Sequence, residues 1–137
     1  MILVSACLLG INCKYNGENN KNQKVIDYVL GKKFLPICPE QLGGLTTPRL
    51  PAEIIGDKVF LTNGEDVTSK FEKGSLEIMK YTELLPIDFA ILKDGSPSCG
   101  SEFVYDGNFT GTKIKGEGIT TEELRKKGVK VINENNL

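Results

Sequence analysis

Residues 1–17 of this chain read Met-Ile-Leu-Val-Ser-Ala-Cys-Leu-Leu-Gly-Ile-Asn-Cys-Lys-Tyr-Asn-Gly, and this stretch decides the fold. An apolar run over residues 1–6 is interrupted by Cys7 and then by Gly10. A short apolar run that ends at turn-forming residues is typical of a buried strand. The sequence therefore predicts a first strand that places a thiol in the loop at its carboxyl end.

The same order of strand and thiol occurs twice more. The apolar residues 34–37 are followed by Cys38, and the apolar residues 89–93 lead to a Ser-Pro-Ser-Cys-Gly segment that contains Cys99. In an open parallel sheet, the loops at the carboxyl ends of the strands lie together and form the usual binding crevice. We therefore expect the thiols of Cys7, Cys38 and Cys99 to converge on one site.

Helical patterns separate these strands. Apolar residues at helical spacing predict a first helix that ends at Gly31, a long helix from Thr68 to about Leu85, and a last helix over 121–127 before a strand at 129–132. Strands that alternate with helices favour an α/β layer structure with a mainly parallel sheet flanked by helices. We predict a Rossmann-like α/β fold in a single domain.

The local boundaries follow from turn and capping residues. Residues 53–61, with Gly56-Asp57 at their centre, predict a small β-hairpin that serves as a flap. Residues 39–51 hold too much Gly and Pro for a regular element, so we expect an irregular active-site loop there. The hydroxyls of Thr68 and Thr120 are predicted to cap the two later helices.

Composition excludes several classes of partner. The hydrophobic fraction of 39% and charged fraction of 26% are those of a globular protein, and no apolar run has the length that spans a bilayer. A net charge of −1 gives no electrostatic footprint for duplex nucleic acid or an acidic membrane surface. We expect a small-molecule partner and a cytoplasmic location, where reduced cysteines serve catalysis or metal binding.

The chain contains no histidine. This absence removes the commonest general base, the commonest metal ligand and every Ser-His or Cys-His nucleophilic pair. The chemistry must therefore depend on carboxylate, thiol, lysine, hydroxyl or a bound metal.

The four cysteines do not form a known compact metal motif. The spacing Cys7-x5-Cys13, with Cys38 and Cys99 far away, matches neither a zinc ribbon nor a ferredoxin run. Each thiol can instead be a small buried hydrophobe, an interpretation that stays open for Cys13. For Cys7, Cys38 and Cys99, the repeated strand-then-thiol pattern favours metal binding.

Three thiols without histidine suit an iron–sulfur cluster with one open iron better than a zinc site. A fourth thiolate from Cys13 would close that position and indicate a structural or electron-carrying protein.

Several polar side chains accompany these thiols. Glu40 follows Cys38 by two residues and is a candidate general acid and base, although a carboxylate in a helical first turn is an alternative. The hydroxyls of Ser96 and Ser98 can orient a substrate carbonyl or satisfy the backbone of their turn.

Charged and aromatic candidates are less specific. Arg49 and Lys93 are the nearest cations for an anionic substrate group, and a solvated surface role is the alternative for both. Tyr15 and Tyr105 precede turns and are candidates to stack on a substrate ring, with core packing as the alternative.

Taken together, these motifs resemble the thiouracil desulfurase family. The matching segments are Val4–Gly10 with Cys13–Gly17, Cys38-Pro39-Glu40 with Gly43-Gly44-Leu45 and Pro48-Arg49, Gly64–Thr68, and Ser96–Gly100 with Tyr105-Asp106-Gly107. They span essentially the whole chain in order. Lys14 and Asn16 depart from the family pattern, which usually has Arg and Asp at these positions.

The resemblance implies one desulfurase-like domain over residues 1–137, which removes sulfur from a thiolated pyrimidine with a [4Fe-4S] cluster. It implies cluster ligands at Cys7, Cys38 and Cys99, a catalytic glutamate at Glu40 and a substrate-contacting serine at Ser96. An open iron would act as a Lewis acid toward the thiocarbonyl sulfur while Glu40 moves protons, so that hydrosulfide leaves without net redox.

Two other functions remain open from the residues alone. All four cysteines could bind a metal or cluster in a non-catalytic sensor or interaction domain. Alternatively, Cys7 or Cys13 could carry sulfur as a persulfide, with loop N–H groups stabilising the anion.

Overall fold

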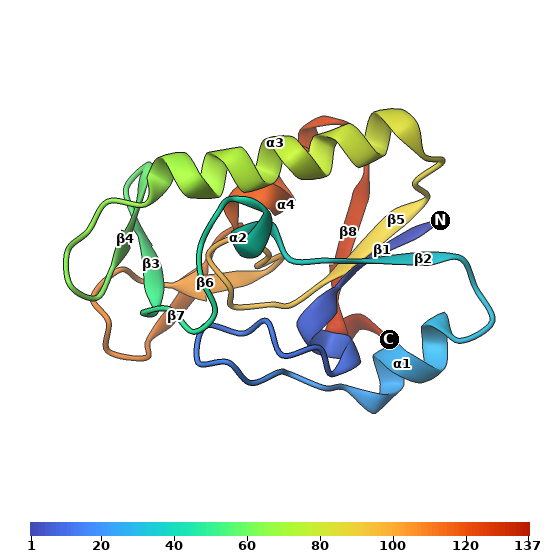
Figure 1. Ribbon diagram of the computed structural model, residues 1–137, viewed down its shortest axis with the longest axis horizontal. Coiled ribbons are helices and arrows are strands. Elements are labelled where there is room, and N and C mark those ends of the chain that lie inside the picture. The colour runs from blue at the N-terminus through green and yellow to red at the C-terminus, as the bar shows by residue number, and fades with distance from the viewer.

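The computed structural model describes all 137 residues and contains a four-stranded sheet in the order β2-β1-β5-β8 (Figure 1). Its strands are β1 (Ile2–Ser5), β2 (Phe34–Ile37), β5 (Phe89–Leu92) and β8 (Lys130–Asn133). Every neighbouring pair is parallel, which confirms the predicted α/β class. All four residues of β1 are buried, as expected for a strand covered on both faces.

Alternating side chains of the sheet pack against different helices, because successive residues of a strand point to opposite faces. Leu3 packs with Ile78 of α3 (Thr68–Leu84) and Leu124 of α4 (Ile119–Lys126). Ile2 and Val4 pack instead with residues of α1 (Gln23–Val29), on the other face. The core therefore consists of two apolar layers separated by the sheet.

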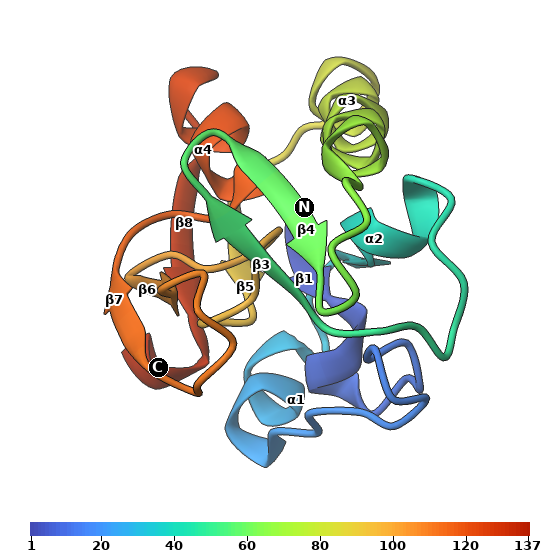
Figure 2. The same cartoon turned by 90° about the vertical axis from the view of Figure 1, so that its left-hand side faces the viewer.

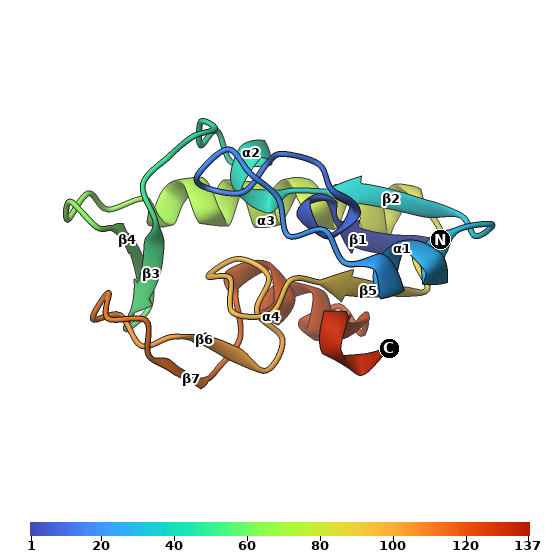
Figure 3. The same ribbon diagram turned by 90° about the horizontal axis from the view of Figure 1, so that it is seen from below.

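The remaining elements gather at one end of the sheet. They are η1 (Ala6–Leu9), α2 (Pro39–Leu42), β3 (Ala52–Ile55), β4 (Lys58–Leu61), β6 (Phe103–Tyr105), β7 (Lys113–Lys115) and η2 (Glu134–Asn136). The β3–β4 and β6–β7 pairs are antiparallel hairpins that lie side by side in Figure 2. The first hairpin packs on α3, which extends beyond the sheet to reach it (Figure 3). No helix of the protein has both the length and the apolar character needed to cross a membrane.

The segment 39–51 is more regular than its composition predicts. Residues 39–42 form the short helix α2, with Cys38 at its N-cap and Pro39 in its first turn. Proline suits the first turn of a helix, since the missing N–H has no partner there in any case. The Gly and Pro residues after Leu42 do form irregular chain, so only the amino-terminal part of the prediction is wrong.

Both predicted threonine caps are wrong. The N-cap of α3 is Val67, and the Thr68 N–H is bound at 2.9 Å by the carboxylate of Asp66. Helix α4 begins at Ile119, so Thr120 lies inside it and its buried hydroxyl has no partner. The N-cap of α4 is Gly118, and the N–H groups of Ile119 and Thr120 donate to the carbonyls of Pro97 and Ser98.

The end of α2 approaches α3 closely enough to require glycine at two positions, one within α3 and one directly after α2. A Cβ atom added to Gly74 of α3 would lie 2.0 Å from the carbonyl oxygen of Pro39, and one added to Gly43 would lie 2.0 Å from that of Lys70. Both distances are shorter than any van der Waals contact. These two glycines therefore fix the position of α2 and of Glu40 within it.

We predict that Gly74→Ala destabilises the protein by about 1–3 kcal/mol, because the methyl group forces α2 away from α3. Helix propensity alone predicts that the substitution stabilises the protein, since alanine is more favourable than glycine in a helix interior by about 1 kcal/mol. Chemical denaturation measures the difference, with the exposed neighbour Lys73→Ala as the control expected to stay within about 0.5 kcal/mol of wild type. A Gly74→Ala protein as stable as wild type contradicts the close-packing argument.

Candidate active site

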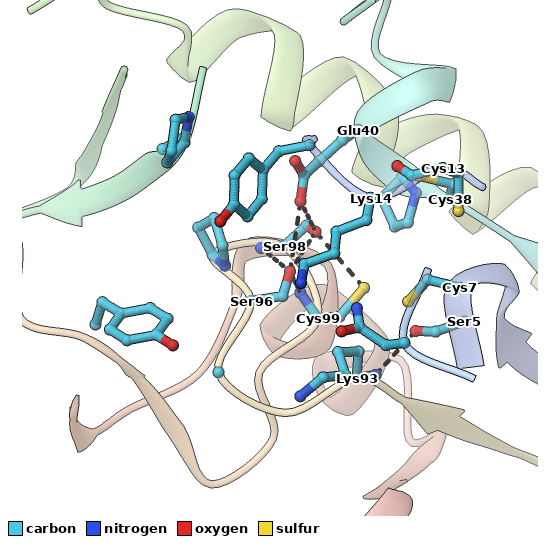
Figure 4. Close-up of a pocket in the computed structure, with 18 of the residues that line it drawn as sticks. Ser5, Cys7, Cys13, Lys14, Cys38, Glu40, Lys93, Ser96, Ser98 and Cys99 are labelled. Atoms are coloured by element: carbon cyan, nitrogen blue, oxygen red, sulfur yellow. Dashed lines mark hydrogen bonds between the residues drawn. The ribbon is translucent and has the colours of Figure 1, made fainter. Parts of the chain in front are cut away.

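A cavity of about 440 Å³ opens at the carboxyl end of the parallel sheet and is lined by all four cysteines. Cys7 comes from η1, Cys13 from the loop after it, Cys38 from the end of β2, and Cys99 from the segment after β5. The structure therefore brings together the three strand-end thiols as expected, and it adds Cys13 to them. Figure 4 shows these side chains facing a common space.

The thiols perturb one another. The Cys13 thiol donates a hydrogen bond to the sulfur of Cys38, which lowers the pKa of Cys38 to about 7, and its hydrogen bond to Cys7 lowers the pKa of that thiol too. Because Cys13 donates to both neighbours, its own pKa is raised. Burial raises the pKa of Cys99 to about 12. Since the thiolate is the ligating and nucleophilic form, the lowered pKa values of Cys7 and Cys38 favour the form that either role requires.

Glu40 faces the same cavity from the first turn of α2. One carboxylate oxygen accepts a hydrogen bond from Arg49 Nε at 3.1 Å, and the other accepts from Ser98 Oγ at 2.8 Å and Ser96 Oγ at 3.4 Å. The side chains of Glu40 and Arg49 are only 14% and 6% exposed. The carboxylate is thus bound by side chains of other segments rather than by the N–H groups of its own helix.

Arg49 is fully engaged within the protein. Its guanidinium also donates to the Cys13 carbonyl at 2.9 Å and to the Thr47 hydroxyl at 3.0 Å. Lys93 is engaged as well, in an ion pair with Glu134 at 2.7 Å. Arg49 and Lys93, the two cations predicted as candidates to bind an anionic substrate group, are therefore both paired with carboxylates of the chain itself.

The segment that carries Ser96, Ser98 and Cys99 is fixed by backbone bonds. The Ser96 hydroxyl accepts the N–H groups of Ser98 and Cys99, each at 3.2 Å. The carbonyls of Pro97 and Ser98 accept the first N–H groups of α4 at 2.9 Å. The loop and the helix terminus thus satisfy each other's backbone groups, which holds the Cys99 thiol in place.

Asp94 and Glu53 are two buried carboxylates that the sequence did not single out. Burial opposes ionisation of Asp94, but three backbone N–H groups, those of residues 101–103, outweigh it and hold the pKa of Asp94 below its usual value. Glu53 accepts the N–H groups of Gly107 at 2.9 Å and Phe109 at 3.2 Å. Sequence patterns do not identify either role, because the N–H groups that these carboxylates bind lie 7–9 residues away for Asp94 and 54–56 residues away for Glu53.

Tyr15 and Tyr105 line the cavity together with Phe109 and Lys14. The two tyrosines are therefore not core residues, and they form wall positions from which a ring can be contacted. Lys14 also lines the cavity, and Figure 4 shows its side chain extending toward Ser96.

The donor set of the cavity fits an iron–sulfur cluster better than a single metal ion. No three Cys, Asp, Glu or His side chains lie close enough together to hold one ion. A four-iron cluster binds each thiolate through a different iron, so its ligands lie farther apart than those around one ion. Thiolates from three strand ends around a shared cavity, with no imidazole nearby, match such a cluster.

Comparisons with known proteins agree on one family. The model of the 2-thiouracil desulfurase family matches residues 2–136. The uncharacterized protein YbbK of Bacillus subtilis (strain 168) is 45% identical over 147 residues, covering 100% of this chain and 97% of that protein. The solved structure of a [4Fe-4S]-dependent thiouracil desulfidase, TudS, superimposes with a TM-score of 0.91 at 43% identity, covering 99% of this chain and 91% of that one. The chain therefore belongs to the 2-thiouracil desulfurase family.

Proposed function

We propose that this protein removes sulfur from a thiolated pyrimidine, either thiouracil or its nucleoside or nucleotide, and releases hydrosulfide without net redox. The observation that carries the proposal is the single cavity in which four cysteines face Glu40 and Ser96. Family membership supports the choice of substrate class. The activity is assigned to one domain over residues 1–137 that acts in the cytoplasm, where thiols stay reduced.

The cofactor in this proposal is a [4Fe-4S] cluster held by Cys7, Cys38 and Cys99. When bound, it supplies an open iron that acts as a Lewis acid toward a thiocarbonyl sulfur. Cys13 stays a thiol beside two of the ligands and is not a ligand itself. The alternative with four thiolate ligands draws on the contact of Cys13 with Cys7 and Cys38, so Cys13 is the residue that separates the two models.

Glu40 is assigned the proton transfers. Its two oxygens are bound separately, one by Arg49 and the other by Ser98, so the carboxylate is fixed in orientation where it faces the cavity. In the ionised form it can accept a proton from the water that attacks the thiocarbonyl carbon, and it can return that proton to the departing sulfur. The balance is that one water and one C=S group give a C=O group and hydrogen sulfide, so no electron donor is needed.

Ser96 is assigned contact with the substrate, and Ser98 is assigned the support of Glu40. Ser98 is buried and makes the shorter bond to Glu40, whereas Ser96 is half-buried and lines the cavity in front of it. A hydroxyl at the position of Ser96 can orient the pyrimidine and pass a proton to Glu40.

We predict that anaerobically purified protein binds about four irons per chain. Cys99→Ser should lose most of this iron, because it removes one of only three thiolates, and Cys13→Ser should retain it. Iron and sulfide analysis with the visible absorption spectrum measures both. Iron-free wild-type protein from such a preparation contradicts the cofactor assignment, and loss of iron in Cys13→Ser favours the four-thiolate model.

We predict that Glu40→Gln keeps the iron and lowers kcat for thiouracil by about 10²–10⁴-fold, since the amide cannot accept the proton. Chromatographic detection of uracil and assay of hydrosulfide measure turnover. Glu65→Gln is the matched control, because Glu65 is an exposed carboxylate outside the cavity. Near-normal turnover by Glu40→Gln would remove the proposed role in proton transfer.

A further inference from the structure

Three cations line the cavity, and two of them are already paired. Arg49 bonds Glu40, and Lys93 bonds Glu134 and the Asp94 carbonyl, both at 2.7 Å. Lys14 is the third, and its ammonium makes no salt bridge and no hydrogen bond within the chain. It is therefore the lining cation that remains available to a ligand.

The position of Lys14 is well defined although its ammonium is unpaired. The backbone N–H of Lys14 donates to the Glu18 carbonyl at 3.1 Å, and its carbonyl accepts from the Gly17 N–H at 2.9 Å. The residue is half-buried, and Nζ lies 5.6 Å from the centre of the Tyr15 ring. Figure 4 shows the side chain directed into the cavity, toward the region of Ser96.

None of the carboxylates that line the cavity forms a salt bridge with Lys14. Glu40 is bound by Arg49 and Ser98, while Glu53 and Asp94 accept backbone N–H groups. An ammonium has three donors and no acceptor, and a donor that loses water without gaining a partner is costly. A ligand that displaces water from this cavity must therefore offer Lys14 an acceptor.

A thiopyrimidine ring has few acceptors to offer. The ring N–H groups are donors and cannot bind an ammonium. Of the two exocyclic acceptors, sulfur is the reacting atom and belongs beside the thiols and Glu40. The ring carbonyl oxygen that the reaction leaves in place is the remaining partner.

We propose that Lys14 determines substrate specificity by donating a hydrogen bond to this unreacted ring oxygen. The inference rests on the proposed function for the identity of the ring. Because the oxygen is present in both substrate and product, the bond contributes equally to both and lowers KM and the Kd of uracil, with little effect on kcat.

The test measures the binding of uracil to anaerobically prepared holoprotein by equilibrium dialysis. Lys14→Met should weaken uracil binding by about 10- to 100-fold, the range expected for loss of a hydrogen bond to a charged group. Lys14→Arg should bind within a few-fold of wild type. Iron content should be unchanged in both variants. Since the Lys14 ammonium contacts only the face of the Tyr15 ring, its removal leaves no buried hydrogen-bonding group without a partner. Lys14→Gln provides a second neutral variant.

Lys32→Met is the matched control, because Lys32 also lies over a tyrosine ring, at 4.4 Å, but lines no part of the cavity. It should bind uracil as wild type does. A second arm compares turnover of 2-thiouracil with that of pyrimidine-2-thione, which lacks the ring oxygen. Lys14→Met should lower kcat/KM for 2-thiouracil and leave kcat/KM for pyrimidine-2-thione unchanged. The effects of removing Lys14 and of removing the ring oxygen are then not additive, as expected for two groups in contact.

Equal uracil affinity in wild type and Lys14→Met overturns the inference, as does a wild type that binds no uracil. Loss of affinity for a pyrimidine nucleotide but not for uracil also overturns it, because the partner would then be phosphate. Loss of iron from Lys14→Met and Lys14→Gln together would assign the residue to the cluster instead. A wild type that binds uracil through Lys14 but releases no hydrosulfide from thiouracil refutes the proposed function alone.

Discussion

The parallel pairing of β1 with β2 and β5 is the constraint on which the cavity depends. Ser5 pairs with Ile37, and Val4 pairs with Ile91, so the three strands end within one or two residues of the same edge. The Lys93 N–H also donates to the Ser5 hydroxyl at 2.9 Å, which ties the two central strand ends together. A shift of register by one residue would turn the buried side chains to the wrong face, so the register of the core also fixes the register of the thiols.

The loops beyond the sheet edge are held by buried carboxylates as well as by short elements of secondary structure. Asp94 gathers three N–H groups of the segment after Cys99, and Glu53 joins the first hairpin to the loop of the second. Charge-assisted bonds from a carboxylate to backbone N–H groups are stronger than neutral ones, and they need no apolar packing. This arrangement keeps the cavity wall ordered while leaving its interior open to a ligand.

The sequence predicted the sheet and the convergence of its three thiols well, because both follow from short apolar runs that end in Cys, Gly or Pro. It failed at α2, whose helical turn depends on the contact between Gly43 and Gly74, residues 31 positions apart. It also failed for Arg49, since an arginine that pairs with Glu40 and binds the Cys13 carbonyl is indistinguishable in sequence from one that awaits an anion. Both features thus depend on tertiary contacts, which the local sequence pattern does not encode.

The absence of histidine links these features to one another. With no imidazole, the proposed base is a carboxylate, and burying a carboxylate is costly unless a cation or several donors lie beside it. Arg49 and Ser98 supply these partners to Glu40, which removes Arg49 from the cations that can meet a substrate. Lys93 is removed in the same way by Glu134. Lys14 is the lining cation that the chain leaves without a carboxylate, and this is why the proposed contact with the ring oxygen is assigned to Lys14. In this proposal, the use of a carboxylate as the base also determines which cation is free to bind the substrate.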